Sequence, residues 1–268
     1  MKKLVFFLLF FSFSYGYEIT FAVLSSGSMI KEYKRFKALS EYITQKTGID
    51  VNLKIIDKYQ DLLDMYKYQK VDLSISCPVV FYKIKASNNV EGIAVVKIDG
   101  MVMEAGVIVV RKDSPIHTVE DLRGAKITLG SSICASNCVM PLYILSINNI
   151  TYEDVSDMWS SGSDKAAILA VLAGLADAAG VKEESALLYI DKGIRILAKS
   201  PYVPRYVVAL SKDLPLDIQK KIKNALYSLK DKKVLEKLGI DGFERPKPDM
   251  FKLIKNYNAV LGQYPLIK

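Results

Sequence analysis

Apolar residues along most of this chain alternate between a two-residue period and a period of three to four residues. The first period is typical of strands and the second of amphipathic helices, so the pattern predicts repeated β-α-β units. Lys31–Lys46, for example, carries Tyr33, Phe36 and Leu39 at helical spacing and ends before Gly48. We therefore expect an α/β fold whose sheets are mostly parallel and flanked by helices on both faces. The other segments with strand-like or helix-like patterns are 19–25, 51–56, 59–68, 71–76, 106–111, 125–130, 138–148, 166–173, 177–181, 206–210 and 216–229.

The same pattern predicts two lobes. A second unit begins near Ala105, and extended segments near residues 101–106 and 199–206 join it to the first. We expect lobe I to comprise residues 17–104 and 206–268, and lobe II to comprise residues 105–205. Two crossing segments between lobes are typical of a hinge. The segment 166–173 is so apolar that we expect it to form a buried helix.

The N-terminus resembles an export signal. Lys2 and Lys3 precede the apolar run Leu4–Phe11, and Ser14–Gly16 supplies the small residues that a signal peptidase cleaves after. This run is far shorter than the ~20 residues that span a bilayer, which makes a retained anchor the weaker alternative. We expect residues 1–16 to be a cleaved signal peptide and the mature chain to be periplasmic.

Charge and length narrow the functional classes. The formal net charge is +8, or +6 without Lys2 and Lys3, and the excess is spread over helices that also carry acids. Such mixing is typical of solvated faces, so we expect no nucleic-acid partner. About 250 mature residues can form one large or two medium domains with real cores.

Strand ends indicate where a ligand would bind. In open α/β sheets, ligands lie beyond the carboxyl ends of the strands. Here those ends are Ser25–Ser28, Ser76–Pro78, Ser131–Asn137 and the loop after Val181. Within residues 126–180, the turn 131–137 and the segment beginning Gly162-Ser163-Asp164 place backbone N–H groups and small polar side chains at helix starts, where an anion can be held. Ordinary helix N-capping is the alternative reading of the turn 131–137 and of Asp164.

Several longer motifs resemble the substrate-binding proteins of phosphonate, phosphite and phosphate ABC importers, over nearly all of the mature chain. These motifs are KVDLSISCPVVFY, VVRKDSPIHTVEDLRGAKITLGSS, GSDKAAILAVLAGLADAA, SPYVPRYVVALSKDLP and LEKLGIDGFERP. The resemblance implies a type II periplasmic-binding fold, without a cofactor, whose two lobes close on a small oxyanion. It further implies that a monomer hands this ligand to an ABC permease.

The resemblance also implies a set of pocket residues. The family's Ser-Thr-Ser run falls on Cys134-Ala135-Ser136, its Gly-Ser-His falls on Gly162-Ser163-Asp164, and its turn glycine falls on Cys77. Acids of some members fall on Glu184 and Tyr206. Together with the strand-end prediction, the candidate ligand-binding residues are Ser25, Tyr59, Ser76, Cys77, Ser131, Ser132, Cys134, Ser136, Asn137, Asp164, Glu184 and Tyr206.

The departures from the family pattern change the expected ligand. Losing one hydroxyl donor from an oxyanion site costs about 1–3 kcal/mol. A carboxylate at Asp164 would repel a dianion unless a proton or cation lies between them. A smaller or less charged oxyanion held by Ser131, Ser132 and Ser136 fits these residues better.

The three cysteines suggest an alternative ligand. Cys77, Cys134 and Cys138 would converge on one cleft in the expected fold, and thiolates suit soft metals such as Cu(I) or thiol-reactive species. The plainer reading is that they are small buried residues. Their spacing alone does not decide whether Cys134 and Cys138 form a disulfide.

Catalysis is not expected. His117, the only histidine, lies in a loop far from the cysteines in sequence, and neither GxSxG nor a P-loop motif occurs. A ligand-sensing subunit that docks on a membrane receptor remains a further alternative to transport.

Overall fold

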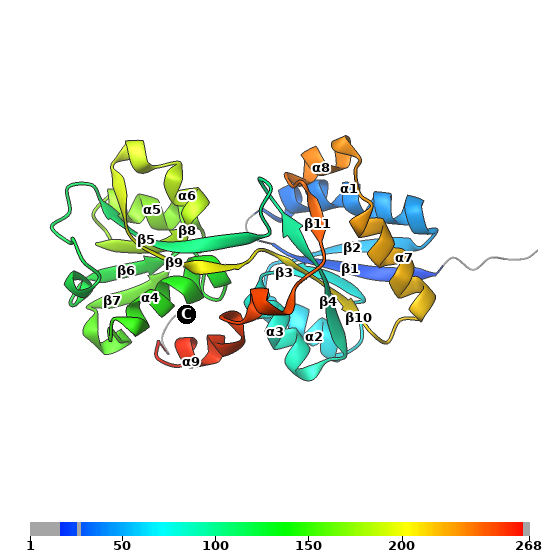
Figure 1. The fold of residues 1–268 in the computed structure, drawn as a ribbon, viewed down its shortest axis with the longest axis horizontal. Coiled ribbons are helices and arrows are strands. Elements are labelled where there is room, and N and C mark those ends of the chain that lie inside the picture. Colours follow the sequence, from blue (N-terminus) through cyan, green and yellow to red (C-terminus); the bar gives the residue numbers. More distant parts are fainter. Residues whose placement is uncertain (1–16, 26–27, 265–268) are drawn as a thin grey trace, which may run out of the picture.

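Two separate sheets form the frame of the computed structural model, which describes residues 17–25 and 28–264. Each sheet has helices on both faces, and the two helix–sheet units lie side by side (Figure 1). The expected two-lobed arrangement is confirmed. The signal-peptide prediction for residues 1–16 lies outside the described residues.

Lobe I contains a six-stranded sheet in the order β11-β4-β10-β3-β1-β2. The strands are β1 (Glu18–Leu24), β2 (Asp50–Ile56), β3 (Leu73–Ser76), β4 (Val90–Lys97), β10 (Val207–Ser211) and β11 (Gly242–Glu244). One face packs on α1 (Met29–Thr47), α7 (Leu216–Tyr227) and α8 (Lys232–Leu238). The other packs on α2 (Tyr59–Lys67) and α3 (Pro78–Ser87).

Lobe II contains a five-stranded sheet in the order β7-β6-β8-β5-β9. The strands are β5 (Met103–Arg111), β6 (Lys126–Leu129), β7 (Asp157–Ser160), β8 (Ala178–Lys182) and β9 (Ile194–Pro204). One face packs on the π-helical turn η2 (Ala135–Val139) and on α4 (Met140–Ile147). The other packs on α5 (Asp164–Leu172) and α6 (Glu183–Leu187). Short 3-10 turns complete the chain: η1 (Glu120–Leu122), η3 (Tyr152–Asp154), η4 (Ile190–Lys192), η5 (Pro248–Phe251) and η6 (Ile254–Asn256).

Both sheets are mixed, whereas the sequence pattern predicts mostly parallel ones. Pairing is parallel for β1 with β2 and β3, and for β6 with β7 and β8. It is antiparallel for β10 with β3 and β4, for β11 with β4, and for β5 with β8 and β9. The reason is that β10 returns from lobe II, inserts between β3 and β4 and runs opposite to both. A β-α-β pattern constrains only successive strands that a helix connects.

The helix over 164–172 is buried on one side only. Ala167, Ile168 and Val171 are buried, but Leu169 is 45% exposed. The expectation of a fully buried helix is therefore wrong. Composition does not distinguish a fully buried helix from one that is buried on one side, because a helix rich in alanine can be apolar all round and still pack along one narrow stripe.

Two strands join the lobes. The start of β5 pairs with the end of β9, with Met103 opposite Pro204 and Glu104 opposite Val203. Beyond them, the chain enters lobe I on one side through Met101 and on the other through Arg205, whose N–H donates to Val102 O at 2.9 Å. These are the two expected crossings, and their pairing makes them a two-stranded connection.

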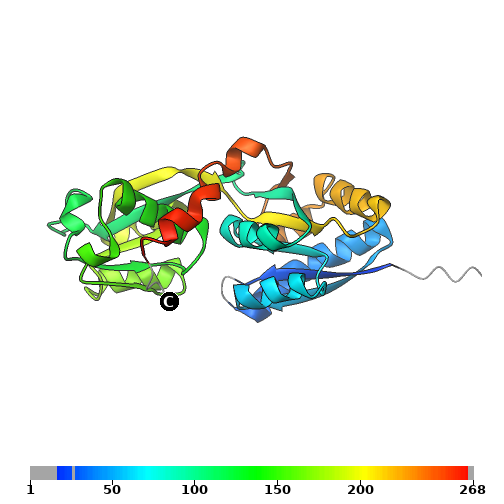
Figure 2. The ribbon, with the colours of Figure 1, turned by 90° about the horizontal axis from the view of Figure 1, so that it is seen from below.

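The C-terminal segment contacts both lobes. Phe251 and Tyr257 pack in the cluster around α3, whereas Tyr264 is buried in the lobe II core. Figure 2 shows α9 (Tyr257–Leu261) alongside lobe II after the chain has left β11. The assignment of 206–268 to lobe I thus does not describe where the last residues pack.

Candidate functional site

Two helix starts, one from each lobe, meet at the junction. Cys77 is the N-cap residue of α3 in lobe I, and Cys134 is the N-cap residue of η2 in lobe II. Both belong to one apolar cluster that includes Val80, Ala135 and Val139. The side chains of the two cysteines interact. After burial, the Cys134 thiol is the largest cause that raises the pKa of Cys77, and the Cys77 thiol is the largest cause that lowers the pKa of Cys134. The carboxyl end of β3 and the turn after β6 are thus brought together, as the strand-end rule predicts.

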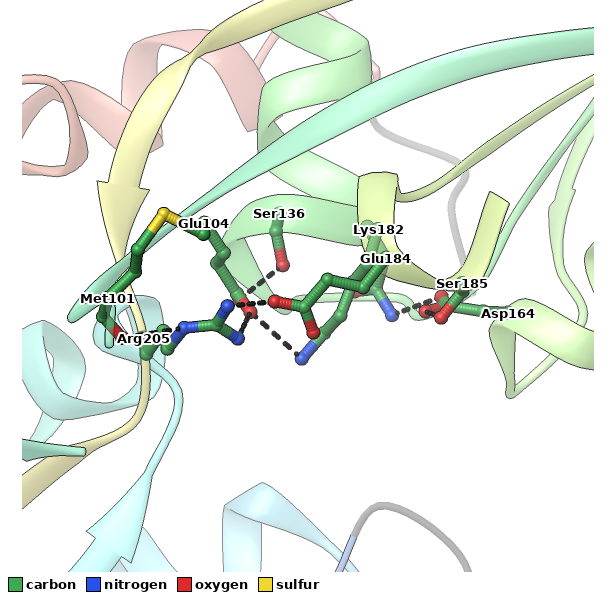
Figure 3. Close-up of polar contacts among 9 residues, drawn as sticks. Met101, Glu104, Ser136, Asp164, Lys182, Glu184, Ser185 and Arg205 are labelled. Atoms are coloured by element: carbon green, nitrogen blue, oxygen red, sulfur yellow. Dashed lines mark hydrogen bonds and ion pairs between the residues drawn. The ribbon is translucent and has the colours of Figure 1, made fainter. Parts of the chain in front are cut away.

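A buried network of charged side chains lies beside this junction (Figure 3). Glu104, 7% exposed, accepts a 2.6 Å hydrogen bond from Ser136 Oγ. Its other oxygen lies 3.3 Å from Arg205 Nη1 and 3.3 Å from Lys182 Nζ. Arg205, 1% exposed, also pairs with Glu184. Two cations and two carboxylates therefore balance one another where the chain crosses between lobes.

Lys182 remains a cation in this setting. Burial acts to lower its pKa, but Tyr206, Glu104, Cys134 and Asp164 outweigh burial and leave the pKa above its usual value. The Lys182 ammonium also lies 4.8 Å from the centroid of the Tyr206 ring, within cation–π range. A fixed positive charge is thus held next to both helix starts.

A second polar group forms at the start of α5. Asp164 accepts hydrogen bonds of 2.7 Å each from Asn137 Nδ2 and Ser185 Oγ. Its carboxylate lies so close to Gly130 that a Cβ there would be 2.1 Å from Asp164 Oδ1. The end of β6, the start of α5 and η2 are therefore joined through one carboxylate.

Two buried polar atoms near the junction have no hydrogen-bond partner within the described part of the chain: Ser76 Oγ and Asn137 Oδ1. Ser76 is fully buried at the end of β3, directly before the α3 N-cap. An unpaired buried hydroxyl costs free energy, so a native structure usually supplies a partner for it. Ser76 therefore has an open donor and Asn137 an open acceptor.

Seven of the twelve candidate residues belong to these connected groups. They are Cys77, Cys134, Ser136, Asn137, Asp164, Glu184 and Tyr206. Ser136 differs from expectation in one respect. Its single hydroxyl proton is donated to Glu104, so it does not donate to an anion in this arrangement.

The remaining candidates have other surroundings. Ser131 Oγ accepts the N–H groups of Ile133 and Cys134 at 3.1 and 2.9 Å, and so stabilises the turn that precedes η2. Ser132 is exposed, and Tyr59 is half-buried at the start of α2 with Lys83 Nζ 5.9 Å from its ring centroid. Ser25, half-buried after β1, donates its N–H to Ile56 O at 2.7 Å.

Sequence reasoning missed Glu104, Lys182 and Arg205. A signal for each exists. Glu104 is an acid at the start of an apolar strand, Lys182 follows Val181 in a loop that the strand-end rule singles out, and Arg205 lies in a crossing segment. The sequence does not show that the three side chains meet, because Glu104 lies 78 positions before Lys182 and 101 before Arg205.

The soft-metal alternative receives no support from this geometry. Within residues 17–25 and 28–264, no group of three or more His, Cys, Asp or Glu side chains could hold a metal ion. Cys138 is fully buried in the lobe II core, and all three cysteines are free thiols. None of the described helices is long and apolar enough to span a membrane.

Comparisons with known proteins agree with the two-lobed fold. Residues 21–251 match the family model described as "ABC transporter, phosphonate, periplasmic substrate-binding protein". The phosphonates-binding periplasmic protein of Escherichia coli (strain K12) is 24% identical over 241 residues, which cover 82% of this chain and 70% of that protein.

Solved structures share the fold at lower identity. PhnD1 from Prochlorococcus marinus (MIT 9301), solved in complex with methylphosphonate, is 17% identical with a TM-score of 0.78, covering 92% of this chain and 98% of that one. A Xanthomonas citri protein solved with ATP is 17% identical with a TM-score of 0.80, covering 94% of this chain and 99% of that one. The family model spans most of the chain, and the chain belongs to the family of periplasmic substrate-binding proteins of phosphonate ABC transporters.

Proposed function

We propose that the mature chain captures a small oxyanion of the phosphonate, phosphite or phosphate class and delivers it, as a monomer, to the permease of an ABC importer. The family assignment supports the transport role. The names of the Escherichia coli relative and of the methylphosphonate complex support the ligand class. In this proposal the protein performs no catalysis and requires no cofactor.

The observation that carries the proposal is the meeting of two helix starts beside the half-buried ammonium group of Lys182. The N-termini of α3 and of the continuous η2–α4 segment carry partial positive charge and N–H groups that have no partner within the helix. Lys182 adds a full charge, and the Ser76 hydroxyl adds an unpaired donor. The unprotonated oxygens of an oxyanion accept hydrogen bonds from all of these groups at once.

The neighbouring carboxylates favour a ligand of low negative charge. Glu104 and Glu184 take up much of the positive charge of Arg205 and Lys182, and Asp164 lies at the start of α5. A dianion would meet these acids with little cationic charge left to offset them. We expect a monoanion, such as the singly charged form of methylphosphonate or phosphite, to bind better than a dianion.

Closure of the lobes by hinge motion supplies the signal to the transporter. The two-stranded connection between β5 and β9 allows one lobe to rotate relative to the other. A ligand favours closure only if it binds the closed form more tightly than the open one.

Thermal-shift measurements with phosphate, phosphite, methylphosphonate and sulfate, each at millimolar concentration, test the proposal. We expect at least one phosphorus oxyanion to raise the Tm, by an amount that grows with its concentration. Lys182→Met should weaken that ligand roughly 10- to 100-fold, because it removes a buried charged partner.

Lys199→Met is the matched control for that substitution. Lys199 is half-exposed and pairs with Glu183 and Tyr202 on the surface of lobe II. Its loss should leave the affinity unchanged. If no oxyanion raises the Tm at any pH between 5 and 8, the oxyanion proposal fails and only the family membership stands.

A further inference from the structure

The two thiols at the junction belong to different lobes. Cys77 precedes α3 in lobe I, and Cys134 precedes η2 in lobe II, 57 positions later in the chain. Cys77 is 4% exposed and Cys134 is half-buried. Apart from this contact, the cluster around them contains aliphatic and aromatic side chains from both lobes. Their thiols are therefore partners only while the lobes are together.

The third cysteine is placed differently. Cys138 is fully buried and packs among Ile127, Leu142 and Leu145 in the lobe II core. The side chain that acts most strongly on Cys134 is that of Cys77, whereas Cys134 acts on Cys138 only through its charge. A Cys134–Cys138 bridge would draw Cys138 out of that core, whereas a Cys77–Cys134 bridge joins two side chains that share one cluster and interact there.

The two junction thiols also differ in reactivity. The pKa of Cys134 is lowered chiefly by its interaction with Cys77, and further by Ser131 and by the charge of Lys182. Together these effects outweigh burial, which acts to raise the pKa. Burial raises the pKa of Cys77 well above its ordinary value. Because the thiolate is the reactive form, Cys134 is the group that attacks first, and it is also the more exposed of the two.

We propose that Cys77 and Cys134 form a reversible disulfide that locks the two lobes together. The oxidant is a disulfide, either a small molecule such as oxidised glutathione or an exported oxidoreductase. The Cys134 thiolate attacks one of its sulfurs and releases one thiol. Cys77 then loses its proton and attacks the sulfur of Cys134, forming the bridge and releasing the second thiol. Two electrons and two protons pass to the oxidant, which becomes two thiols.

Such a bridge would hold the two lobes in the arrangement of this structure independently of any ligand. The bond links the starts of α3 and η2, the same segments that the oxyanion proposal places around the ligand. An oxidised molecule could neither admit a solute nor release one. A compartment outside the cytoplasm is where such a disulfide persists.

Thiol counting on the full mature chain tests this directly. The reduced protein is treated with excess oxidised glutathione, quenched, and unfolded for titration of its remaining thiols. We expect the count to fall from three to one. Tryptic mapping should then show residues 71–83 joined to residues 127–165, since no Lys or Arg interrupts either peptide before its end.

The peptide 127–165 contains both Cys134 and Cys138, so variants assign the second sulfur. Cys138→Ser should still form the joined peptides, leaving no free thiol. Cys77→Ser should keep both of its remaining thiols, or carry glutathione on Cys134 without an internal bridge.

Three outcomes would overturn the proposal: an internal Cys134–Cys138 bridge in the wild type, joined peptides in Cys134→Ser but not in Cys138→Ser, or three glutathione-resistant thiols in the wild type. None of these readouts uses a ligand. A negative result in the thiol assays therefore does not affect the oxyanion proposal, and a negative ligand screen does not affect the disulfide proposal.

Discussion

Arg205 is the residue on which the polar network depends. It is 1% exposed, bonds Glu104 and Glu184 through its guanidinium, and donates from Nε to Met101 O at 3.2 Å. These three contacts tie both crossing segments to α6 of lobe II. Glu104 is also buried. In a buried ion pair, removing one partner destabilises the protein far more than the intact pair stabilises it, because an unpaired buried charge remains.

We predict that Arg205→Met lowers the free energy of unfolding by about 3–5 kcal/mol, because it leaves Glu104 buried with only Lys182 as a counterion. Denaturant unfolding followed by circular dichroism measures this. The control is Arg123→Met, which breaks a surface pair with Asp154 and should hardly move the midpoint.

Adding Glu104→Gln to Arg205→Met should recover part of the loss, since the unpaired charge is then removed. Equal stability of the two Arg205 variants would show that the guanidinium acts through packing and not through its charge.

At the scale of elements, the position of η2 decides what the site can contain. This π-helical turn lies directly on β5, where Gly106 has no side chain and its N–H donates to Ser200 Oγ at 3.0 Å. A Cβ on Gly106 would lie 2.1 Å from Ser136 O and 2.9 Å from Pro141 Cδ. The close approach of η2 to β5 brings Ser136 within reach of Glu104.

Gly106→Ala should therefore push η2 away from β5 and destabilise the protein by about 1–3 kcal/mol, the usual effect of overpacking. The same substitution at Gly92 is the control. A Cβ there would meet the ring of Phe81 at 2.8 Å, and a side chain can shift more easily than a carbonyl group of the backbone.

Thermal unfolding of both variants measures the difference. A Tm for Gly106→Ala at or above that of Gly92→Ala would contradict the proposed role of this contact.

For the whole molecule, the C-terminal segment is a third connection between the lobes. It leaves β11, packs Phe251 against Phe81 and Tyr82 of α3, and then follows α4 of lobe II. Tyr264, 2% exposed, donates its hydroxyl to Ile150 O at 2.5 Å. Lobe rotation must therefore carry this segment along or release it from one side.

Tyr264→Ala should lower the free energy of unfolding by about 3–5 kcal/mol, as loss of a buried aromatic side chain does. It should also release the segment from lobe II, which small-angle scattering would detect as a larger radius of gyration. Tyr68→Ala, at a tyrosine that is 61% exposed, is the control and should change neither quantity.

An unchanged radius of gyration in Tyr264→Ala, despite reduced stability, would show that the segment stabilises lobe II without restraining the lobes.

The local elements could be predicted from the sequence because their causes are local. The period of the apolar residues places helix α1 within two residues of its observed ends, and Gly48 stops it in the left-handed conformation with φ 71°. The strand-end rule likewise brings together Ser76, Cys77 and the turn at Cys134, because strand order within each unit follows from β-α-β connections.

Contacts between distant segments were decided by the tertiary structure alone. The antiparallel insertion of β10, the exposed face of α5 and the meeting of Glu104, Lys182 and Arg205 depend on how two lobes close over two crossings. No local period encodes such pairings, since each is selected by burial and charge balance in the assembled molecule. The sequence by itself therefore determined the family, the lobes and the helix starts that face each other, and folding decided which side chains remain open to a ligand there.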